Sequence, residues 1–350
     1  MAALAVIVVS WNTRDLLRRC VETVHASLAG SGIAYEIVVV DNASSDGTAD
    51  MLRAEHPEVV LIEAGRNLGF AGGNNVALRR VLSTKPAPDS KLKAQSSRLD
   101  YVLLLNPDTE VVGDAIPRLA RFLDAHPDVA VAGPQLRYPD GSVQSSRRRF
   151  PSRAAYFWES TPLERRWPGN PWARRYRCAD ATDDVEQEVD WLVGAALMVR
   201  RAAIARAGLL DAGFAMYSEE LEWQRRISQQ PAVSNRQPAG SPAADCRRIV
   251  YLPDAIIVHH EGKSSEQALA RRYLNFQRSR IREAGITYGP RFAAALRLFL
   301  RAAYAADLAS EAAKWLLGHK RELRARRVGV YWQVVRGLAE RDIIARVDAT

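Results

Sequence analysis

Residues Leu103-Leu104-Leu105-Asn106-Pro107-Asp108 bring an apolar run to an abrupt end. The run begins at Tyr101, and its length, together with the turn formers after it, is typical of a buried central strand in a parallel sheet. Pro107 cannot donate to a strand ladder, and it biases Asn106 toward an extended conformation. We therefore expect the strand to end at Leu105 and Asp108 to lie just beyond its carboxyl end.

The predicted place of Asp108 favours a ligand site. Open α/β sheets bind ligands at the carboxyl ends of their strands. A carboxylate there can hold a hard divalent cation, which in turn can hold a diphosphate. Asn-Pro-Asp also forms good turns, so a simple turn is the alternative for this stretch considered alone.

Apolar runs before this stretch alternate with helical patterns. Strands are predicted at 4–9, 36–40 and 59–62, with helices over about 13–29 and from 49, where Thr48 is the expected cap. This βαβαβ layout predicts an α/β fold with a Rossmann-like, mostly parallel sheet flanked by helices. A dehydrogenase would carry Gly-x-Gly-x-x-Gly after its first strand, whereas this chain has Ser10-Trp11-Asn12, which argues against a nicotinamide or flavin enzyme.

Polar residues follow the other predicted strands as well. Asp41 can accept hydrogen bonds from a nucleobase or ribose, or it can form an Asx-turn. The loop after the third strand, residues 65–75, is rich in glycine and asparagine, and its Arg66 offers a fork for phosphate or base. A flexible connection with helix-capping asparagines is the alternative for that loop.

Acidic residues and histidines mark the second half of the chain. Ser218 is a predicted helix N-cap, so Glu219 and Glu220 either complement the helix dipole, by about 0.3–1 kcal/mol each, or offer a general base to a cleft. His259 and His260 follow a predicted strand. With Asp108 at another strand end, one of these histidines can belong to a metal site, although a structural role is the alternative.

The composition narrows the functional classes. The chain has 350 residues and a net charge of +9 at pH 7, which suits polyanionic partners: nucleic acid, an anionic membrane or phosphorylated substrates. Cys20, Cys178 and Cys246 are far apart and odd in number, as in a reduced cytosolic protein. The apolar start lacks the basic residues of a signal peptide, and no run of about 18 apolar residues predicts a membrane-spanning helix.

Several segments interrupt or extend the predicted sheet. We expect residues 84–97 to form a surface loop and 229–247 a disordered insertion, while 147–177 is irregular, basic and aromatic. From about residue 268 the pattern is helical. The basic and aromatic stretch 319–335 can lie on an anionic membrane surface, or it can pack on the core or on another subunit.

Considered together, these motifs resemble family 2 glycosyltransferases with the GT-A fold, in particular the bacterial rhamnosyltransferase-like members. The motifs occur in the family's order between about residues 4 and 285. They are Val8-Val9-Ser10-Trp11-Asn12, Val39-Val40-Asp41-Asn42-Ala43-Ser44-Ser45-Asp46-Gly47-Thr48, Arg66-Asn67-Leu68-Gly69-Phe70-Ala71-Gly72-Gly73-Asn74-Asn75, Leu105-Asn106-Pro107-Asp108-Thr109, Asp190-Trp191 to Ala195, Tyr217-Ser218-Glu219-Glu220-Leu221-Glu222 and His259 to Ser264.

The resemblance implies a role for each matching residue. Asp108 matches the metal-binding acid of the family's Asp-x-Asp motif, with Asn106 in place of the other acid. His259 matches a histidine that assists the metal or diphosphate, because a glycine and a serine follow it at the family's spacing. Glu220 matches the catalytic base, which is usually an aspartate. The implied nucleotide-binding residues are Ser10, Asn12, Asp41, Arg66, Asn67 and Asn106, and the implied acceptor-binding residues are Trp191, Gly194, Ala195, Glu219 and Glu222.

The resemblance also implies an activity. We expect an inverting transfer of a sugar, rhamnose being the leading candidate, from a nucleoside-diphosphate sugar to a hydroxyl of a glycan or lipid-linked acceptor in cell-surface polysaccharide synthesis. The expected cofactor is Mg²⁺ or Mn²⁺. Residues 1–270 form the expected GT-A domain, with a nucleotide-binding half over 1–115 and an acceptor-binding half over 116–270. Residues 271–350 form a helical extension that can place a cytoplasmic protein on the inner face of the membrane or in a homo-oligomer.

Three other functions remain as alternatives. Asn106 and Glu220 depart from the family pattern, so a catalytically degenerate nucleotide-sugar-binding or scaffold protein is the main one. A nucleotidyltransferase would have a basic, glycine-rich loop after its first strand, which is missing here. Nucleic-acid binding depends on net charge alone, so we expect no nucleic-acid partner.

Overall fold

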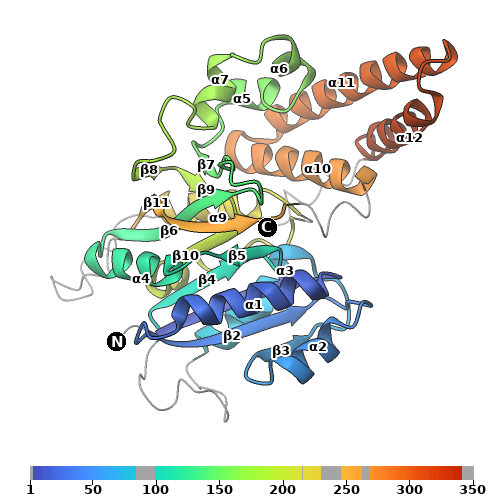
Figure 1. Ribbon diagram of the computed structural model, residues 1–350. Coiled ribbons are helices and arrows are strands. Elements are labelled where there is room, and N and C mark those ends of the chain that lie inside the picture. Colours follow the sequence, from blue (N-terminus) through green and yellow to red (C-terminus); the bar gives the residue numbers. More distant parts are fainter. Residues whose placement is uncertain (1–2, 84–98, 215, 230–245, 262–268, 341–350) are drawn as a thin grey trace. The chain divides into compact units, whose positions relative to one another are not determined.

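The computed structural model describes residues 3–83, 99–214, 216–229, 246–261 and 269–340 (Figure 1). The chain forms two compact units. The sheet unit comprises Met1–Phe150, Ala181–Ala212 and Glu220–Ser264, and the helical unit comprises Pro151–Asp180, Gly213–Glu219 and Ser265–Thr350. The segment after Phe150 therefore groups with the C-terminal helices. The expected division at residues 115 and 270 stays a prediction.

The first half of the sheet unit has the predicted alternation of strands and helices. Strands β1 (Ala3–Ser10), β2 (Ala34–Asp41), β3 (Val60–Glu63) and β4 (Tyr101–Leu105) are parallel. Helices α1 (Arg14–Leu28), α2 (Thr48–Glu55) and α3 (Gly69–Leu82) connect them. The register pairs Ser10 with Asp41 and Val8 with Leu105, so the strands end at one common edge.

The second half extends the same sheet. Its elements are β5 (Thr109–Val111), α4 (Ala115–Ala125), β6 (Val129–Arg137), β8 (Gln187–Val189), β10 (Ala196–Arg200), α8 (Arg201–Ala207), α9 (Glu219–Gln229) and β11 (Arg248–His259). The strand order is β3-β2-β1-β4-β10-β6-β11-β5, with β8 on β11, and β7 (Arg147–Arg148) pairs with β9 (Trp191–Leu192) in a small second sheet. Only β10, β5 and β8 run against the others. The structure confirms the predicted fold class of a mostly parallel sheet flanked by helices.

Alternation along β1 explains how helices cover both faces of the sheet. Leu4, Val6 and Val8 belong to the same buried cluster as Leu17, Val21 and Val24 of α1 and the apolar side of α4. On the opposite face, α3 comes so close that a Cβ on Gly73 would lie 2.6 Å from Val9 Cγ1. The glycine-rich start of α3 is therefore needed for close packing against β1.

Two local predictions were wrong. Thr48 does not cap α2: Gly47, with φ +82°, precedes the helix, and the Thr48 hydroxyl lies 2.6 Å from Asp46 Oδ1. Ser218 lies directly before α9 with φ +65°, and its role as an N-cap stays a prediction. The segment 147–177 is not irregular, because it contains β7 and the short helices α5 (Arg153–Trp158), α6 (Pro162–Arg166) and α7 (Pro171–Tyr176).

The helical unit contains α10 (Leu269–Tyr288), α11 (Pro290–Leu316) and α12 (Arg321–Gly337), which confirms the predicted C-terminal helical region. Its core combines Ile281 of α10, Leu296 and Leu300 of α11 and Val334 of α12 with Tyr156 of α5. The buried Arg280 donates to the carbonyl oxygens of Tyr156 and Glu159, at 2.9 and 3.0 Å. These bonds hold the end of α5 against α10.

Some predictions concern residues outside the described ranges or whole-chain features. The expected loop at 84–97 and nearly all of the expected insertion at 229–247 lie outside the described residues. None of the described helices is long and apolar enough to cross a membrane. All three cysteines are buried and form no disulfide bond in the described part of the chain.

Candidate active site

The predicted nucleotide-binding residues gather at the carboxyl edge of the sheet because their strands end there. Ser10 is fully buried, and its hydroxyl lies 2.9 Å from that of Thr13 at the start of α1. Asn12 has φ +52°, receives the Ser45 amide on its Oδ1 at 2.8 Å, and donates its own amide to the Ser44 hydroxyl at 2.9 Å. Ser10 and Asn12 thus shape the connection from β1 to α1.

Asp41 lies at the end of β2, beside Ser10. It is 4% exposed, and both carboxylate oxygens lie 3.2–3.3 Å from the Ser44 amide nitrogen. The Ser44 amide is three residues on from Asp41, whereas an Asx-turn bonds the amide two residues on, so the contact is not the expected Asx-turn. The carboxylate keeps further acceptor capacity. A role for Asp41 in nucleotide binding stays a prediction.

The loop from β3 to α3 is tied to the end of β2. Asn42 donates through Nδ2 to the Gly69 carbonyl at 3.2 Å and receives the Leu68 amide on Oδ1 at 3.4 Å. Asn67 Oδ1 accepts the Gly69 amide at 2.9 Å at the start of α3. Arg66 is exposed on this anchored loop, where its guanidinium can reach an incoming anion.

Asp108 and His259 meet where the β4–β5 turn lies against the end of β11. Thr109 pairs with His259 in the antiparallel ladder. Asp108 Oδ1 is 3.4 Å from His259 Nε2, and the two side chains are each 7% exposed. His260 instead points its Nε2 to Glu110, at 2.8 Å. Of the two adjacent histidines, His259 is therefore the one that lies beside Asp108.

Two residues that were not predicted fix the His259 imidazole. Gln144 Nε2 donates to a Glu261 carboxylate oxygen at 2.8 Å, so the amide oxygen of Gln144 faces His259 Nδ1 at 2.9 Å. An ionised carboxylate only accepts hydrogen bonds, which sets the orientation of the Gln144 amide. Nδ1 must then carry the proton in neutral His259, and Nε2 keeps its lone pair. This is the tautomer that binds a metal through Nε2.

The donor set fits a divalent cation. The buried Asp108 carboxylate lies beside the lone pair on His259 Nε2, and the side-chain Nδ2 of Asn106 is 3.3 Å from the same Nε2. Carboxylate oxygens suit Mg²⁺ and Mn²⁺, and the His259 imidazole adds one nitrogen donor beside them. Asp108 and His259 would hold the ion, with Asn106 beside it.

Glu220, in the first turn of α9, lies against Gly194. A Cβ on Gly194 would be 3.3 Å from the Glu220 Cβ and Cγ. Burial raises the pKa of the Glu220 carboxyl above the usual 4.5, while the Gly194 backbone and the positive charge of Arg148 partly oppose this. The carboxylate is therefore a stronger base than an exposed glutamate.

Gln224, one turn further along α9, fixes this helix against the chain before Gly194. Its amide receives the Leu192 N–H at 2.9 Å and donates to the Leu192 carbonyl at 2.7 Å. A glutamine in a polar helix has no distinctive pattern, so sequence reasoning did not find it. Its effect is to set the distance between Gly194 and Glu220.

Glu220 and the candidate metal ligands lie at the same edge of the sheet. The backbone N–H of Asn106 donates to the Ala195 carbonyl at 2.9 Å, at the junction of β4 and β10. Ala195 follows Gly194, which contacts Glu220, while Asn106 lies beside His259. A short chain of contacts therefore connects the candidate base to the candidate metal ligands.

The predicted acceptor-binding residues differ in the burial and hydrogen bonds of their side chains. Trp191 is 6% exposed and its indole donates to the Arg149 carbonyl at 3.1 Å. Glu222 accepts two hydrogen bonds from Arg226, at 2.6 and 2.9 Å, and Glu219 is buried in the first turn of α9. Gly194 and Ala195 line the junction described above. The acceptor role of all five stays a prediction.

Known proteins resemble this chain in sequence. Residues 5–182 match the family model described as "Glycosyl transferase family 2". The N-acetylglucosaminyl-diphospho-decaprenol L-rhamnosyltransferases of two Mycobacterium tuberculosis strains, CDC 1551 / Oshkosh and ATCC 25618 / H37Rv, are each 30% identical over 244 residues, 68% of this chain and 72% of theirs. The low-salt glycan biosynthesis hexosyltransferase Agl10 of Haloferax volcanii is 25% identical over 227 residues, 65% of this chain and 62% of its own.

A solved structure shares the fold. The crystal structure of GalNAc-T7 with UDP, GalNAc and Mn²⁺ matches 81% of this chain and 48% of its own length, with a TM-score of 0.50 and 14% sequence identity. At that identity the likeness concerns the fold alone.

Proposed function

The chain belongs to glycosyl transferase family 2, and from this membership we propose that it is an inverting, metal-dependent glycosyltransferase of cell-surface polysaccharide synthesis. The donor would be a nucleoside-diphosphate sugar, with rhamnose as the leading sugar because similar proteins are named as rhamnosyltransferases. The acceptor would be a hydroxyl of a glycan or lipid-linked sugar. The name of those relatives, which contains a decaprenol-linked diphosphate sugar, supports a lipid-linked acceptor here.

One observation carries the proposal: Asp108 and His259 lie 3.4 Å apart at the sheet edge that also holds Glu220. A transferase of this type needs a group that neutralises the departing diphosphate and a base that activates the acceptor. The backbone hydrogen bond from Asn106 to Ala195 connects the segment beside Glu220 to the segment beside His259. Few structural roles alone would require a buried acid, a buried histidine and a carboxyl of raised pKa at one edge.

Glu220, Asp108 and His259 have separate roles in a single displacement at the anomeric carbon. Glu220 takes the proton of the acceptor hydroxyl as its oxygen forms a bond to the anomeric carbon. The bond from that carbon to the diphosphate breaks, and the nucleoside diphosphate leaves with the electron pair. A Mg²⁺ or Mn²⁺ ion held by Asp108 and His259 would supply positive charge for the leaving diphosphate. A single displacement inverts the configuration at the anomeric carbon.

The remaining residues would hold the substrates. Asp41 accepts from the base or ribose, Arg66 pairs with phosphate, and Ser10, Asn12, Asn67 and Asn106 shape the donor site. Trp191, Gly194 and Ala195 form the floor of the acceptor site, with Glu219 and Glu222 nearby on α9. This donor site suits a nucleotide sugar, and we propose no nucleic-acid partner.

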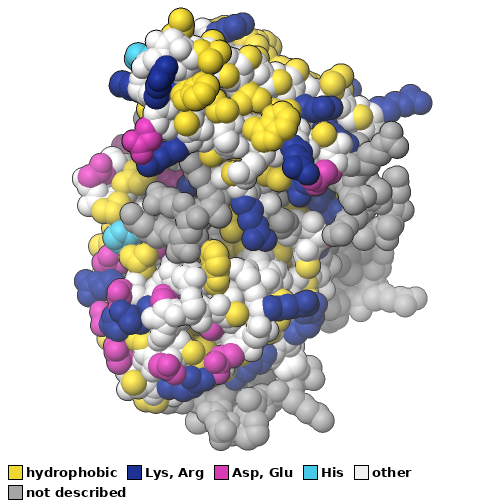
Figure 2. Space-filling view, turned by 90° about the vertical axis from the view of Figure 1, so that its right-hand side faces the viewer, with side chains coloured by type: hydrophobic (Ala, Val, Ile, Leu, Met, Phe, Trp, Pro, Cys, Tyr) yellow, Lys and Arg dark blue, Asp and Glu magenta, His cyan; other side chains and the backbone are white. Residues whose placement is uncertain are grey.

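The helical unit offers a surface for peripheral membrane contact. Leu316, Leu317 and Trp332 are 70%, 85% and 57% exposed on and after α11 and on α12, near the basic residues of 319–327. Figure 2 shows hydrophobic and basic side chains close together over the helical unit, in the upper part of the view. Apolar side chains next to arginines suit an anionic lipid surface. We propose a cytoplasmic enzyme that can bind the inner face of the membrane, whether or not it forms a homo-oligomer.

A nucleotide-binding test addresses the site directly. Thermal shifts of wild-type protein and Asp108→Asn would be measured with UDP, dTDP, GDP and CMP, each with Mn²⁺ or EDTA. We expect one nucleotide to stabilise the wild type only with Mn²⁺, and Asp108→Asn to lose most of that shift. Transfer from the matching nucleotide sugar to a lipid-linked acceptor would follow. Binding without transfer would instead support the nucleotide-sugar-binding scaffold, and no shift with any nucleotide would refute the donor site.

A further inference from the structure

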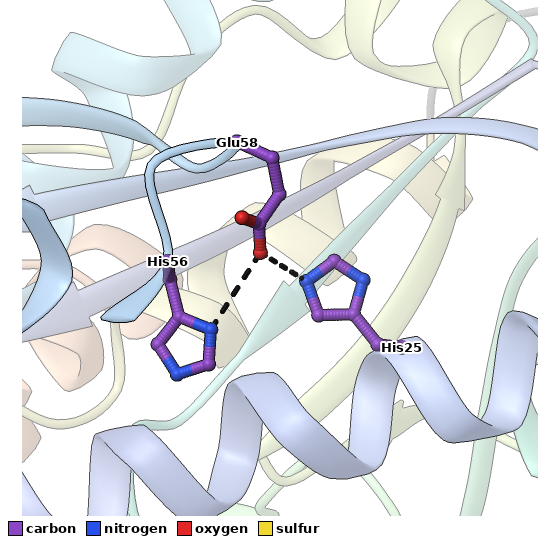
Figure 3. Close-up of side chains that lie close together, drawn as sticks. All are labelled: His25, His56 and Glu58. Carbon is purple, nitrogen blue, oxygen red and sulfur yellow. Dashed lines mark hydrogen bonds and ion pairs between the residues drawn. The ribbon is translucent and has the colours of Figure 1, made fainter. Parts of the chain in front are cut away.

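His25, His56 and Glu58 form a cluster that the proposed reaction does not use. One ligand atom from each of them lies within 4.8 Å of the other two. The Glu58 carboxylate oxygen is 2.8 Å from His25 Nε2 and 3.6 Å from His56 Nδ1. Figure 3 draws both contacts as dashed lines. Both imidazoles therefore present a nitrogen to the same oxygen.

The cluster lies at the amino edge of the sheet, opposite the candidate active site. His25 is in the last turn of α1, which leads from the end of β1 back to the start of β2. His56 directly follows α2, and Glu58 lies two residues before β3. The cluster thus joins the end of α1 to the connection between α2 and β3.

The surroundings prepare these side chains for a cation. His25 Nδ1 lies 2.8 Å from the Tyr35 hydroxyl, so a proton on Nδ1 can bond there while Nε2 keeps its lone pair. In His56, Nδ1 is the ring nitrogen that faces Glu58, at 3.6 Å.

We propose that His25, His56 and Glu58 form a zinc site that stabilises the nucleotide-binding half of the sheet unit. Two imidazoles and one carboxylate are a recurrent zinc ligand set, and they leave a fourth position for water. Zinc bonds of about 2.1 Å in a tetrahedron separate neighbouring ligand atoms by about 3.4 Å. The two contacts to Glu58, 2.8 and 3.6 Å, bracket that separation. Hard cations such as Mg²⁺ prefer all-oxygen sites, so they would compete poorly here.

Zinc binding can be measured independently of sugar transfer. Tag-free protein would be stripped with EDTA and titrated calorimetrically with Zn²⁺, and Co²⁺ would report a tetrahedral site through its visible absorption. We expect the wild type to bind a zinc ion that Asp108→Asn still binds, and the affinity for this ion to fall by more than about tenfold in His25→Gln and His56→Gln. Glu58→Gln keeps the shape of the side chain and loses its charge, so its zinc affinity should also be lower than that of the wild type.

Two controls isolate the cluster. His319→Gln removes an exposed histidine elsewhere and should bind zinc like the wild type, while Asp108→Asn alters the other candidate metal site and should keep the zinc that His25→Gln and His56→Gln lose. Far-ultraviolet circular dichroism would confirm that each variant is folded. Zinc should raise the melting temperature of wild type and Asp108→Asn and leave that of His56→Gln unchanged. Zinc affinity that is undetectable in the wild type, unchanged in His56→Gln or lost in Asp108→Asn would overturn the proposal.

Discussion

The amide oxygen of Gln144 lies 2.9 Å from Nδ1 of His259, and the Glu261 carboxylate holds that amide in place. Gln144 thus assigns the proton of His259 to Nδ1 and leaves Nε2 toward Asp108. Outer partners of this kind orient a ligand histidine and raise its basicity. Gln144 and Glu261 are therefore positioning residues for the candidate metal site.

The first prediction is that Gln144→Ala weakens metal binding at the candidate active site without unfolding the protein. Losing the outer partner should reduce Mn²⁺ affinity by about 10- to 100-fold. The measurement is a Mn²⁺ titration of nucleotide binding, with Ser142→Ala as the control, because its exposed hydroxyl bonds only within the turn to Asp140, at 2.6 Å. An unchanged Mn²⁺ affinity in Gln144→Ala would remove Gln144 from this role.

A second prediction concerns the base. Glu220→Gln keeps the shape of the side chain but cannot take a proton, so turnover should fall by about 10²- to 10⁴-fold while nucleotide affinity stays near that of wild type. Initial rates and calorimetric binding on the same preparation separate these effects. Glu188→Gln, which alters an exposed carboxylate paired with Arg248, serves as the matched control. Equal turnover in Glu220→Gln and wild type would exclude Glu220 as the base.

A third prediction follows from the raised pKa of Glu220. The base acts only when ionised, so kcat/KM, which reports the free enzyme, should fall as the pH drops through that pKa, and this acid limb should lie above pH 4.5. Arg148 contributes positive charge that lowers the pKa, so Arg148→Met should move the limb to higher pH. Arg121→Met on α4 removes an equal charge from the Asp114 pair and should not move it. A limb in the same place for Arg148→Met would contradict this electrostatic assignment.

A fourth prediction concerns stability of the helical unit. Burial raises the pKa of Glu283 on α10 to about 7, and a hydrogen bond from Thr287 only partly opposes this. The unfolded chain releases this proton near pH 4.5 while the folded chain keeps it, so stability is greatest at low pH and declines as the pH rises toward about 7. The full loss is about 3 kcal/mol. Glu283→Gln should remove that decline.

Urea denaturation at pH 5 and pH 8 measures this difference. The free energy of unfolding of the wild type should be lower at pH 8, while Glu283→Gln should show a smaller change between the two values. Glu322→Gln, on the exposed start of α12, is the control and should behave like wild type. A wild type that is equally stable at both values would refute the prediction.

The sequence predicted the sheet edge well because apolar runs and turn formers are local features. Tyr101 to Leu105 is a buried strand, and Asp108 follows it, as expected. The place of β10 between β4 and β6 was not predictable, because strand pairing between distant segments has no local pattern. That pairing places Ala195 beside Asn106. Because Ala195 follows Gly194, which contacts Glu220, it also places Glu220 near the candidate metal ligands.

The positioning residues were missed for a different reason. Gln144 and Gln224 act through amide groups that bond to distant partners, Glu261 and Leu192. Glutamine is also common on ordinary surfaces, so its residue type alone predicts nothing. The positive φ values of Tyr217 and Ser218 before α9 were likewise not predicted. Such strained backbone depends on the surrounding structure and often accompanies functional sites.

The last prediction tests whether the spacing between Gly194 and Glu220 matters. A Cβ on Gly194 would lie 3.3 Å from Glu220 Cβ and Cγ, so Gly194→Ala must shift the carboxylate by a few tenths of an ångström. Misplacement of a catalytic group on this scale lowers kcat more than it lowers stability. We expect kcat to fall by about tenfold or more, with nucleotide affinity and melting temperature near those of wild type. Gly169→Ala, where a Cβ meets nothing within 4 Å, should leave kcat unchanged. Because Gln224 sets the same spacing from the helix side, Gln224→Ala should lower kcat in the same way, and full activity in both variants would show that this spacing does not limit the reaction.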